Sequence, residues 1–116
     1  MDSIRILEKD VQRTCIDYLD AKRIMYLRLN AGDTFRPGQN GKLYKVRGAP
    51  KGTADLLILS HHEVLHCIGP RPLFIEFKSS AGKQTDEQEA FSNDVEIRGY
   101  EYYVIRSLDE LIEVLQ

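Results

Sequence analysis

Two apolar runs with an acidic residue at one end stand out in this chain: Gly52-Thr53-Ala54-Asp55-Leu56-Leu57-Ile58-Leu59 and Leu73-Phe74-Ile75-Glu76-Phe77-Lys78. Runs of this length and composition predict strands that are covered on both faces of a sheet. Because side chains alternate along a strand, Glu76 and Lys78 point to one face and Phe77 points to the other. We therefore expect two carboxylates and one ammonium group to meet at the edge of a core.

Such a group has a specific chemistry. Two carboxylates supply the oxygen ligands that Mg²⁺ or Mn²⁺ takes, and a lysine beside them can hold a water molecule or a phosphate oxygen. Neighbouring carboxylates repel each other, so their pKa values should be raised without a cation, and metal affinity should depend on pH. We expect Lys78 to position water or phosphate by its charge and not to act as a free-amine base. The alternative is that Asp55 and Glu76 are strand-end acids in a salt bridge with Lys78.

Length and composition indicate a single globular domain over residues 1–116. The chain is 42% hydrophobic and 29% charged, as in soluble proteins. It has no apolar window long enough to cross a bilayer, and its first residues lack the basic-then-apolar pattern of a signal peptide. Two cysteines, Cys15 and Cys67, fit a reducing compartment. We therefore expect no membrane partner and a cytoplasmic location. A compact stand-alone domain of this kind would also suit a bacterial or phage-infected cell.

The charge is unevenly distributed along the chain. Residues 36–83 hold eight basic and three acidic side chains, a net charge of +5, whereas residues 85–116 hold nine acidic and two basic ones, a net charge of −7. A local basic surface attracts phosphate even when the whole protein carries a net charge of −2. Each basic residue could equally be a solvated surface charge, and the segregation could be incidental. The candidate phosphate contacts are Arg28, Asn30, Arg36, Lys42, Lys45, Arg47, Lys51 and Lys83.

Periodicity and capping residues predict the remaining elements. We expect a helix over residues 3–23, capped by Asp2 or Ser3, with an apolar stripe of Ile4, Leu7, Val11, Cys15, Tyr18 and Leu19. A strand over 24–30 precedes a mobile loop over 31–51 that holds one short strand at 43–46. The two acidic strands form a hairpin with a turn-containing segment between them. A helix over 86–98 that buries Phe91 and Val95, a strand over 102–105 and a helix opened by a capping box at Ser107 complete one mixed sheet flanked by helices, in the order α-β-β-β-β-α-β-α.

Four separated motifs on this succession resemble one known family. Glu8, Gly52-x-x-Asp55, Glu76-x-Lys78 and Gln88 are similar to the motifs of the VRR-NUC family, the virus-type replication-repair nucleases of the PD-(D/E)xK superfamily. The resemblance covers nearly the entire chain, and the segment 99–107 also looks like the family's closing strand and helix. One position departs from it, because Ala54 stands where the family often has proline. Proline there would shape the turn and would bind no metal.

The resemblance implies a restriction-endonuclease-like fold and a role for each motif residue. Asp55 and Glu76 would hold Mg²⁺ or Mn²⁺ with the backbone carbonyl of Phe77, and Lys78 would orient or activate the attacking water. Glu8 would reach the metal directly or through water, and Gln88 would steady the site. The implied reaction is hydrolysis of DNA phosphodiester bonds, with no small-molecule cofactor beyond the metal. Stand-alone members are similar to Holliday-junction resolvases, which act as homodimers on branched DNA.

Several alternatives remain open. The chain could be a non-catalytic DNA-binding or recombination accessory protein, or a nuclease for flaps, nicks, single strands or RNA. Asp10 or Asp17 could take the place of Glu8, and Gln88 could serve only in a capping box with Thr85. A further cluster suggests zinc, but it lies within one hairpin without a second group of ligands, so we favour an exposed turn. That cluster consists of His61, His62, His66 and Cys67.

Overall fold

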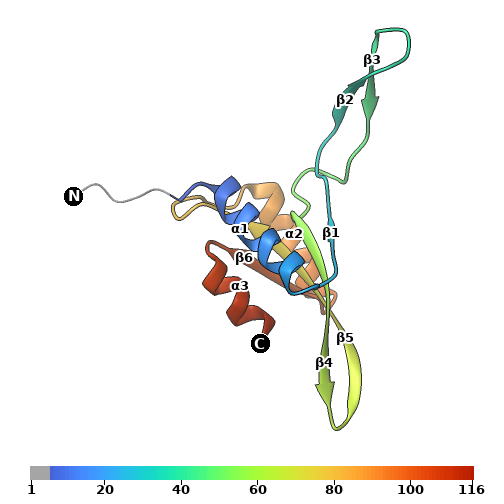
Figure 1. The fold of residues 1–116 in the computed structure, drawn as a ribbon. Helices are drawn as coiled ribbons and strands as arrows, with labels where there is room; N and C mark the ends of the chain where they lie inside the picture. The colour runs from blue at the N-terminus through green and yellow to red at the C-terminus, as the bar shows by residue number, and fades with distance from the viewer. Residues whose placement is uncertain (1–5) are drawn as a thin grey trace, which may run out of the picture.

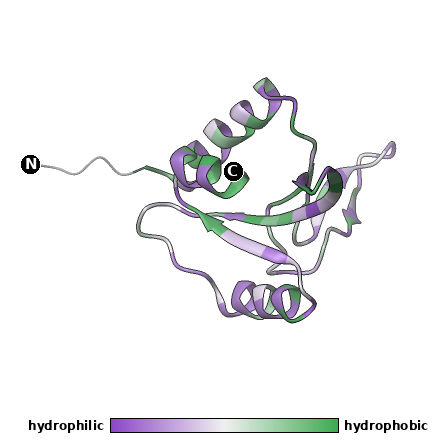
Figure 2. Cartoon of the chain, turned by 90° about the horizontal axis from the view of Figure 1, so that it is seen from below, coloured by the Kyte–Doolittle hydropathy of each residue, from purple (hydrophilic) through white to green (hydrophobic). Residues whose placement is uncertain are grey.

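A four-stranded mixed sheet lies between two layers of helices in the computed structural model, which describes residues 6–116 (Figure 1). The sheet order is β1-β4-β5-β6, formed by β1 (Tyr26–Arg28), β4 (Leu56–Val64), β5 (Cys67–Phe77) and β6 (Glu101–Ile105). β1, β4 and β5 are antiparallel neighbours, and β6 runs parallel to β5. Helices α1 (Glu8–Ala21) and α3 (Leu108–Leu115) cover one face, and α2 (Asp86–Ile97) covers the other (Figure 2). The predicted mixed sheet with flanking helices is confirmed.

The main core lies between the sheet and the α1–α3 layer. Alternation along the inner parts of β4 and β5 points Leu56, Ile58, Leu73, Ile75 and Phe77 toward these helices, and each of them is buried. Burying a side chain of this size contributes about 1.5–3 kcal/mol. The opposite face is more open, with Phe74 packed edge-on against Phe91 of α2 at 5.6 Å between ring centroids. The core residues are Val11, Cys15, Ile16, Leu19, Leu56, Ile58, Leu73, Ile75, Phe77, Ile105 and Leu111.

Helix α1 begins later than predicted. It starts at Glu8, and Leu7 takes the N-cap position in an extended conformation without a side-chain cap. Leu7 is exposed and is not part of the buried stripe, which begins at Val11 and includes Ile16. The apolar pattern alone could not separate a helical turn from an extended segment at this end. The predicted caps, Asp2 and Ser3, and the first stripe residue, Ile4, lie outside the described residues.

The predicted capping box of α2 is confirmed. Thr85 accepts a hydrogen bond from the Gln88 backbone N–H, and the Gln88 side chain accepts one from the Thr85 N–H. The helix ends at Ile97, followed by Gly99 at φ +88°. At α3, Ser107 caps the helix as predicted, but the Glu110 carboxylate accepts from the backbone N–H of the preceding residue, 106, and not from that of Ser107. Within residues 6–116, no helix has the length and apolar character to span a bilayer.

The segment predicted as a loop with one short strand contains two strands. β2 (Thr34–Pro37) pairs antiparallel with β3 (Leu43–Val46) and forms a separate two-stranded sheet. We call residues 33–47 the arm, because it projects from the body (Figure 1). The prediction of a single sheet was therefore wrong, and the element order contains one more strand. Pro37 and the turn residues 38–41 obscured β2 in the sequence, since they are typical of loops.

The β4–β5 hairpin is longer than predicted. Its strands continue to Val64 and from Cys67, and the two residues between them, Leu65 and His66, have φ of +51° and +66°. Two residues with positive φ form the tight turn that matches the twist of a hairpin, although neither is a typical turn residue. Pro70 and Pro72 lie within β5, in the part that precedes the pairing with β6, so they lose no hydrogen bond to that strand.

Candidate functional site

Asp55 lies at a distortion where β4 begins. The register pairs Leu56 with Ile75, yet the Asp55 N–H donates to the Ile75 carbonyl at 2.9 Å, so two consecutive residues face one partner, as in a β-bulge. The Asp55 carbonyl accepts from the Leu29 N–H at 2.9 Å. Its side-chain Oδ2 accepts from the Phe77 N–H at 2.8 Å. The backbone hydrogen bonds with Ile75 and Leu29, together with the side-chain bond from Phe77, therefore fix the direction of the Asp55 carboxylate.

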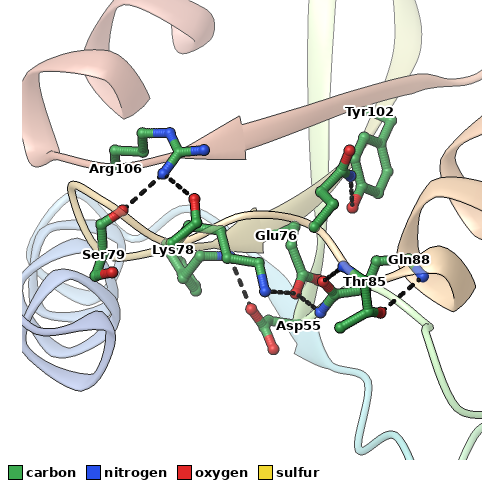
Figure 3. Close-up of polar contacts among 11 residues, drawn as sticks. Asp55, Glu76, Lys78, Ser79, Thr85, Gln88, Tyr102 and Arg106 are labelled. Carbon is green, nitrogen blue, oxygen red and sulfur yellow. Dashed lines mark hydrogen bonds and ion pairs between the residues drawn. The ribbon is translucent and has the colours of Figure 1, made fainter.

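Glu76 is a buried carboxyl group at the end of β5, with only 1% of its surface exposed. Its Oε1 accepts a hydrogen bond from Nε2 of Gln88 and lies 4.0 Å from Nζ of Lys78 (Figure 3). Its Oε2 is buried and has no hydrogen-bond partner within the described residues. Because buried polar atoms are nearly always paired, this oxygen calls for a partner such as a proton, a water molecule or a cation. Of the two Glu76 oxygens, Oε2 is therefore the one that no described residue engages.

Burial and mutual repulsion alter the acidity of both carboxyl groups. Burial and the negative charge of Asp55 together raise the pKa of Glu76 to about 8, although the Lys78 ammonium opposes the shift. The pKa of Asp55 is also raised, chiefly by burial, while the hydrogen bond from Phe77 opposes the shift. Near neutral pH, Glu76 therefore holds a proton when no cation is present, and a divalent cation would compete with that proton.

Glu8 acts on this pair through its charge. It is exposed on the first turn of α1, and its negative charge raises the pKa of both Asp55 and Glu76. Asp10 and Asp17 contribute to neither pKa shift, and Oδ1 of Asp10 lies 3.7 Å from Nη2 of Arg13. Of these three acids on α1, Glu8 is therefore the one whose field reaches the pair. Among residues 6–116, no three His, Cys, Asp or Glu side chains form a group that could hold a metal ion.

Gln88 connects the site to the start of α2 (Figure 3). Its Oε1 accepts from the Thr85 N–H at 2.9 Å, and its Nε2 donates to Glu76. Only one orientation of the amide satisfies both partners, because the opposite one would place an acceptor against a carboxylate. The same side chain therefore completes the capping box and contacts the Glu76 carboxyl group, two arrangements that the sequence presented as alternatives.

Gly52 allows α2 to lie this close to Asp55. It is buried and has φ of +93°, and a Cβ added there would lie 2.5 Å from the carbonyl oxygen of Glu87. Any other residue would meet both backbone strain and this contact. The glycine of the Gly52-x-x-Asp55 motif therefore has a packing role, since it fits the segment before Asp55 against the first turn of α2. Ala54, the position that departs from the family, is buried.

The segment after Glu76 is anchored by β6. Lys78 is buried, and its N–H donates to the Ile105 carbonyl at 3.1 Å. Arg106, the next residue along, donates from Nη1 to the carbonyls of Ser79 at 2.7 Å and Gly82 at 2.6 Å (Figure 3). One guanidinium group thus fixes both ends of the loop that follows Lys78.

Two residues near Asp55 and Glu76, namely Tyr102 and Gln84, were not predicted from the sequence. The Tyr102 hydroxyl accepts a hydrogen bond from Nε2 of Gln84 at 3.0 Å. Burial, followed by the charge of Glu76, raises the pKa of Tyr102 to about 12. Alternation places Tyr102 on one face of β6, but only the parallel register with β5, which pairs it with Phe74, brings it near the acids. Sequence offered no signal for that register.

The predicted phosphate contacts do not all lie together. Arg36, Lys42, Lys45 and Arg47 lie on the arm, whereas Arg28 ends β1 and lines a shallow depression with α1. Lys51 lies 3.5 Å from Glu87, and Asn30 and Lys83 are exposed on connecting segments. The histidines of the suggested zinc cluster and Cys67 are exposed on the outer part of the β4–β5 hairpin. The clearest concentration of basic side chains is therefore the arm.

Comparison of the chain with protein-family models, with curated proteins and with solved structures found no match. The resemblance to the VRR-NUC family stays a prediction. The donor groups of this site are the two carboxylates of Asp55 and Glu76, the ammonium group of Lys78 and the amide of Gln88, all at one end of the sheet. This set suits a hard divalent cation together with an anionic substrate.

Proposed function

We propose that this protein is a divalent-metal-dependent nuclease of the VRR-NUC type, with a restriction-endonuclease-like fold, that hydrolyses phosphodiester bonds in DNA. The observation that carries the proposal is the buried Oε2 of Glu76, which has no hydrogen-bond partner within the described residues and belongs to a carboxyl group whose pKa Asp55 helps to raise. A structural salt bridge with Lys78 involves only the other oxygen, Oε1, and so accounts for half of this carboxyl group.

The donor set fits Mg²⁺ or Mn²⁺. Asp55 and Glu76 would hold the ion, the Phe77 carbonyl would add a third oxygen, and Glu8 would reach the metal directly or through water. When bound, a divalent cation neutralises charge on phosphoryl oxygens and lowers the pKa of a water nucleophile. With two protein carboxylates, most coordination positions remain for water and phosphate oxygens, as is usual for Mg²⁺.

The protein's own side chains would orient the reactants. Lys78 carries a buried ammonium group 4.0 Å from Glu76, where its positive charge can hold a water molecule or a phosphate oxygen. Gln88 fixes the Glu76 carboxylate, and the bulge with its three hydrogen bonds fixes Asp55. Rigid placement of charge before the substrate arrives is the main way in which such sites accelerate phosphoryl chemistry.

Branched DNA cut by a homodimer is the substrate and assembly that we favour. One protomer provides one such site, and symmetric cleavage of two strands requires two sites, which a twofold dimer supplies. The basic arm supports a nucleic-acid substrate. The rival function is a DNA-binding accessory protein without catalysis, but a decayed site would be expected to lose an acid or the lysine.

Cleavage of labelled Holliday junction, flap, duplex and single-stranded DNA, with Mg²⁺, Mn²⁺ or EDTA, tests the proposal. We expect cutting with metal only, and a loss of at least about 100-fold in Asp55→Ala and Lys78→Ala. Asp17→Ala removes an exposed acid of α1 and serves as the matched control, which should cut like the parent. Equal cutting by the Asp55 and Lys78 variants would refute the site. A protein that binds branched DNA and cuts none of these substrates would be the accessory protein.

A further inference from the structure

The arm leaves and rejoins the body beside the candidate site. β1 ends where the Leu29 N–H bonds the Asp55 carbonyl, and the returning chain passes Gly52 on its way to Asp55. At the base of the arm, the Gly32 N–H donates to the Ala49 carbonyl at 2.8 Å, and the Ala49 N–H donates to the Asn30 carbonyl at 2.7 Å. These bonds attach the arm at the same end of the sheet as the acids, away from the tip of the β4–β5 hairpin (Figure 1).

The arm is strongly basic. Its residues, 33–47, contain four basic side chains and one acidic side chain, a net charge of +3 in a chain whose overall net charge is −2. Asp33 pairs with Lys45 at 3.1 Å. In the part of the chain that the structure describes, the other three basic side chains, Arg36, Lys42 and Arg47, have no carboxylate within ion-pair distance.

The arm also exposes large apolar side chains. Phe35 is 65% exposed, Leu43 is 69% exposed and Tyr44 is 51% exposed. An isolated two-stranded sheet has no core of its own and is marginally stable in water. Exposed aromatic rings on such an element indicate a surface that binds something.

Each aromatic ring of the arm lies across the ladder from a cation. The register pairs Phe35 with Lys45 and Arg36 with Tyr44, so both faces of the two-stranded sheet carry a ring beside a positive charge. Proteins that bind single-stranded nucleic acid use this combination, in which rings stack on bases and cations contact the neighbouring phosphates. Stacking requires bases that are not enclosed in a duplex, because only unpaired bases expose their faces.

We propose that the arm binds unpaired nucleotides of the nucleic acid whose phosphodiester bond reaches Asp55 and Glu76. Phe35 and Tyr44 stack on the bases, and Arg36 and Lys45 contact the phosphates. The proposal rests on the proposed function for the placement of the bond to be cut, while binding by the arm needs neither metal nor cleavage. It gives a physical reason for a preference for branch points and flaps, where bases are unpaired.

A second projecting element offers a matched control. The tip of the β4–β5 hairpin also exposes large apolar residues, Val64, Leu65 and Ile68, but residues 59–70 contain no lysine or arginine. It therefore lacks the charge complementarity that favours a nucleic acid on the arm. Truncation of aliphatic side chains at this tip therefore matches truncation at the arm in exposure but removes no aromatic ring.

Fluorescence anisotropy in EDTA tests the proposal with a labelled single strand, a duplex with an unpaired flap, and a fully paired duplex. We expect the double variant Phe35→Ala with Tyr44→Ala to weaken binding to the single strand and the flap by about tenfold or more. Binding to the paired duplex should change little. The control, Val64→Ala with Ile68→Ala, should bind all three DNAs within about twofold of the parent, because it removes no ring that stacks on a base.

Two further variants separate stacking from charge and from loss of structure. Phe35→Leu with Tyr44→Leu keeps apolar bulk on the arm and should weaken flap binding as the alanine variant does. Arg36→Gln with Lys45→Gln should weaken binding to all three DNAs. For the single strand, the slope of the logarithm of the binding constant against the logarithm of the salt concentration should become shallower by about 0.7 for each phosphate that is no longer neutralised. Circular dichroism and urea unfolding verify that each variant retains the parent fold.

Three outcomes would overturn the proposal. These are unchanged flap binding in the aromatic variants, equal weakening on flap and duplex, or a change of oligomeric state in sedimentation without a change in DNA binding. The last outcome would mean that a second copy of the chain covers the arm. Because the assay uses EDTA, arm-dependent binding by a protein that never cuts DNA would support this inference and refute the proposed function.

Discussion

The Nε2 group of Gln88 donates a hydrogen bond to Oε1 of Glu76. This bond joins the first turn of α2 to the end of β5. Since the same amide also accepts from Thr85, the start of the helix and the buried carboxyl group form one connected unit. A change in either partner should therefore alter both the stability of the helix and the properties of the site.

Separate substitutions at Thr85 and Gln88 should distinguish the cap from the site. Thr85→Ala should lower the free energy of unfolding by about 1 kcal/mol, because it removes an N-cap hydrogen bond, and should leave Mn²⁺ affinity unchanged. Gln88→Ala should lower it by about 1–3 kcal/mol and weaken Mn²⁺ binding by about 10–100-fold, because a buried carboxylate loses its donor. Urea unfolding and calorimetric titration measure both quantities. Equal metal affinities in the two variants would contradict a site role for Gln88.

The raised pKa of Glu76 should make the metal-free protein less stable as pH rises. Its folded pKa of about 8 exceeds the ordinary value of 4.5, so the folded state binds more protons than the unfolded state between these values, and the free energy of unfolding falls across that window. Asp55, whose pKa is also raised, acts in the same direction from lower pH. Urea unfolding from about pH 5 to pH 8 should show this slope, and Glu76→Gln should flatten it. Glu101→Gln is the contrasting control, because Arg71 lowers the pKa of Glu101 and its contribution is lost as pH falls.

Metal binding should release protons. Below about pH 8, Mg²⁺ or Mn²⁺ displaces the proton of Glu76, so affinity should rise with pH and level off above that value. Calorimetric titration in two buffers with different ionisation enthalpies measures the protons released. Glu76→Gln and Asp55→Asn should both abolish binding. Unaltered affinity in either variant would place the metal elsewhere.

Two glycines with similar backbone conformations should respond differently to alanine. Gly52 and Gly32 have φ of +93° and +79°, but a Cβ at Gly52 would meet the Glu87 carbonyl at 2.5 Å, whereas a Cβ at Gly32 would meet no atom of residues 6–116 within 4 Å beyond its chain neighbours. Gly32→Ala should therefore lower the free energy of unfolding by about 1 kcal/mol through backbone strain alone. Gly52→Ala should lower it by at least about 2 kcal/mol more and should weaken Mn²⁺ binding, because α2 and Gln88 must move. Equal destabilisation in urea unfolding would show that the contact with α2 is unimportant.

Local chemical patterns made part of the molecule predictable. The apolar runs at Asp55 and Glu76 specify strands because their composition suits a covered sheet, and Thr85 with Gln88 specifies a helix start because the two groups satisfy each other's backbone. The acids and the start of α2 were therefore predicted at the correct positions. Glu8, by contrast, was assigned through resemblance, and its electrostatic effect on the pair emerges only in three dimensions.

Features that depend on long-range pairing could not be predicted. The bulge at Asp55 exists only relative to Ile75, and the position of Tyr102 depends on the register with β5. Leu65 and His66 occupy turn positions with positive φ that usually hold glycine, asparagine or aspartate, because the long strands beside the turn impose its backbone conformation. β2 was missed for the same reason, since its pairing with β3 outweighs a composition typical of loops.

Pro70 and Pro72 limit how two copies of this chain could join by strand addition. Before Leu73, β5 pairs on this side with no strand of residues 6–116, and a strand that docked there would find prolines in place of two amide donors. Along the outer β4–β5 hairpin, continuous intermolecular sheets are thus restricted to the β4 side. The same prolines protect the protein against edge-to-edge aggregation at one of its most exposed apolar projections.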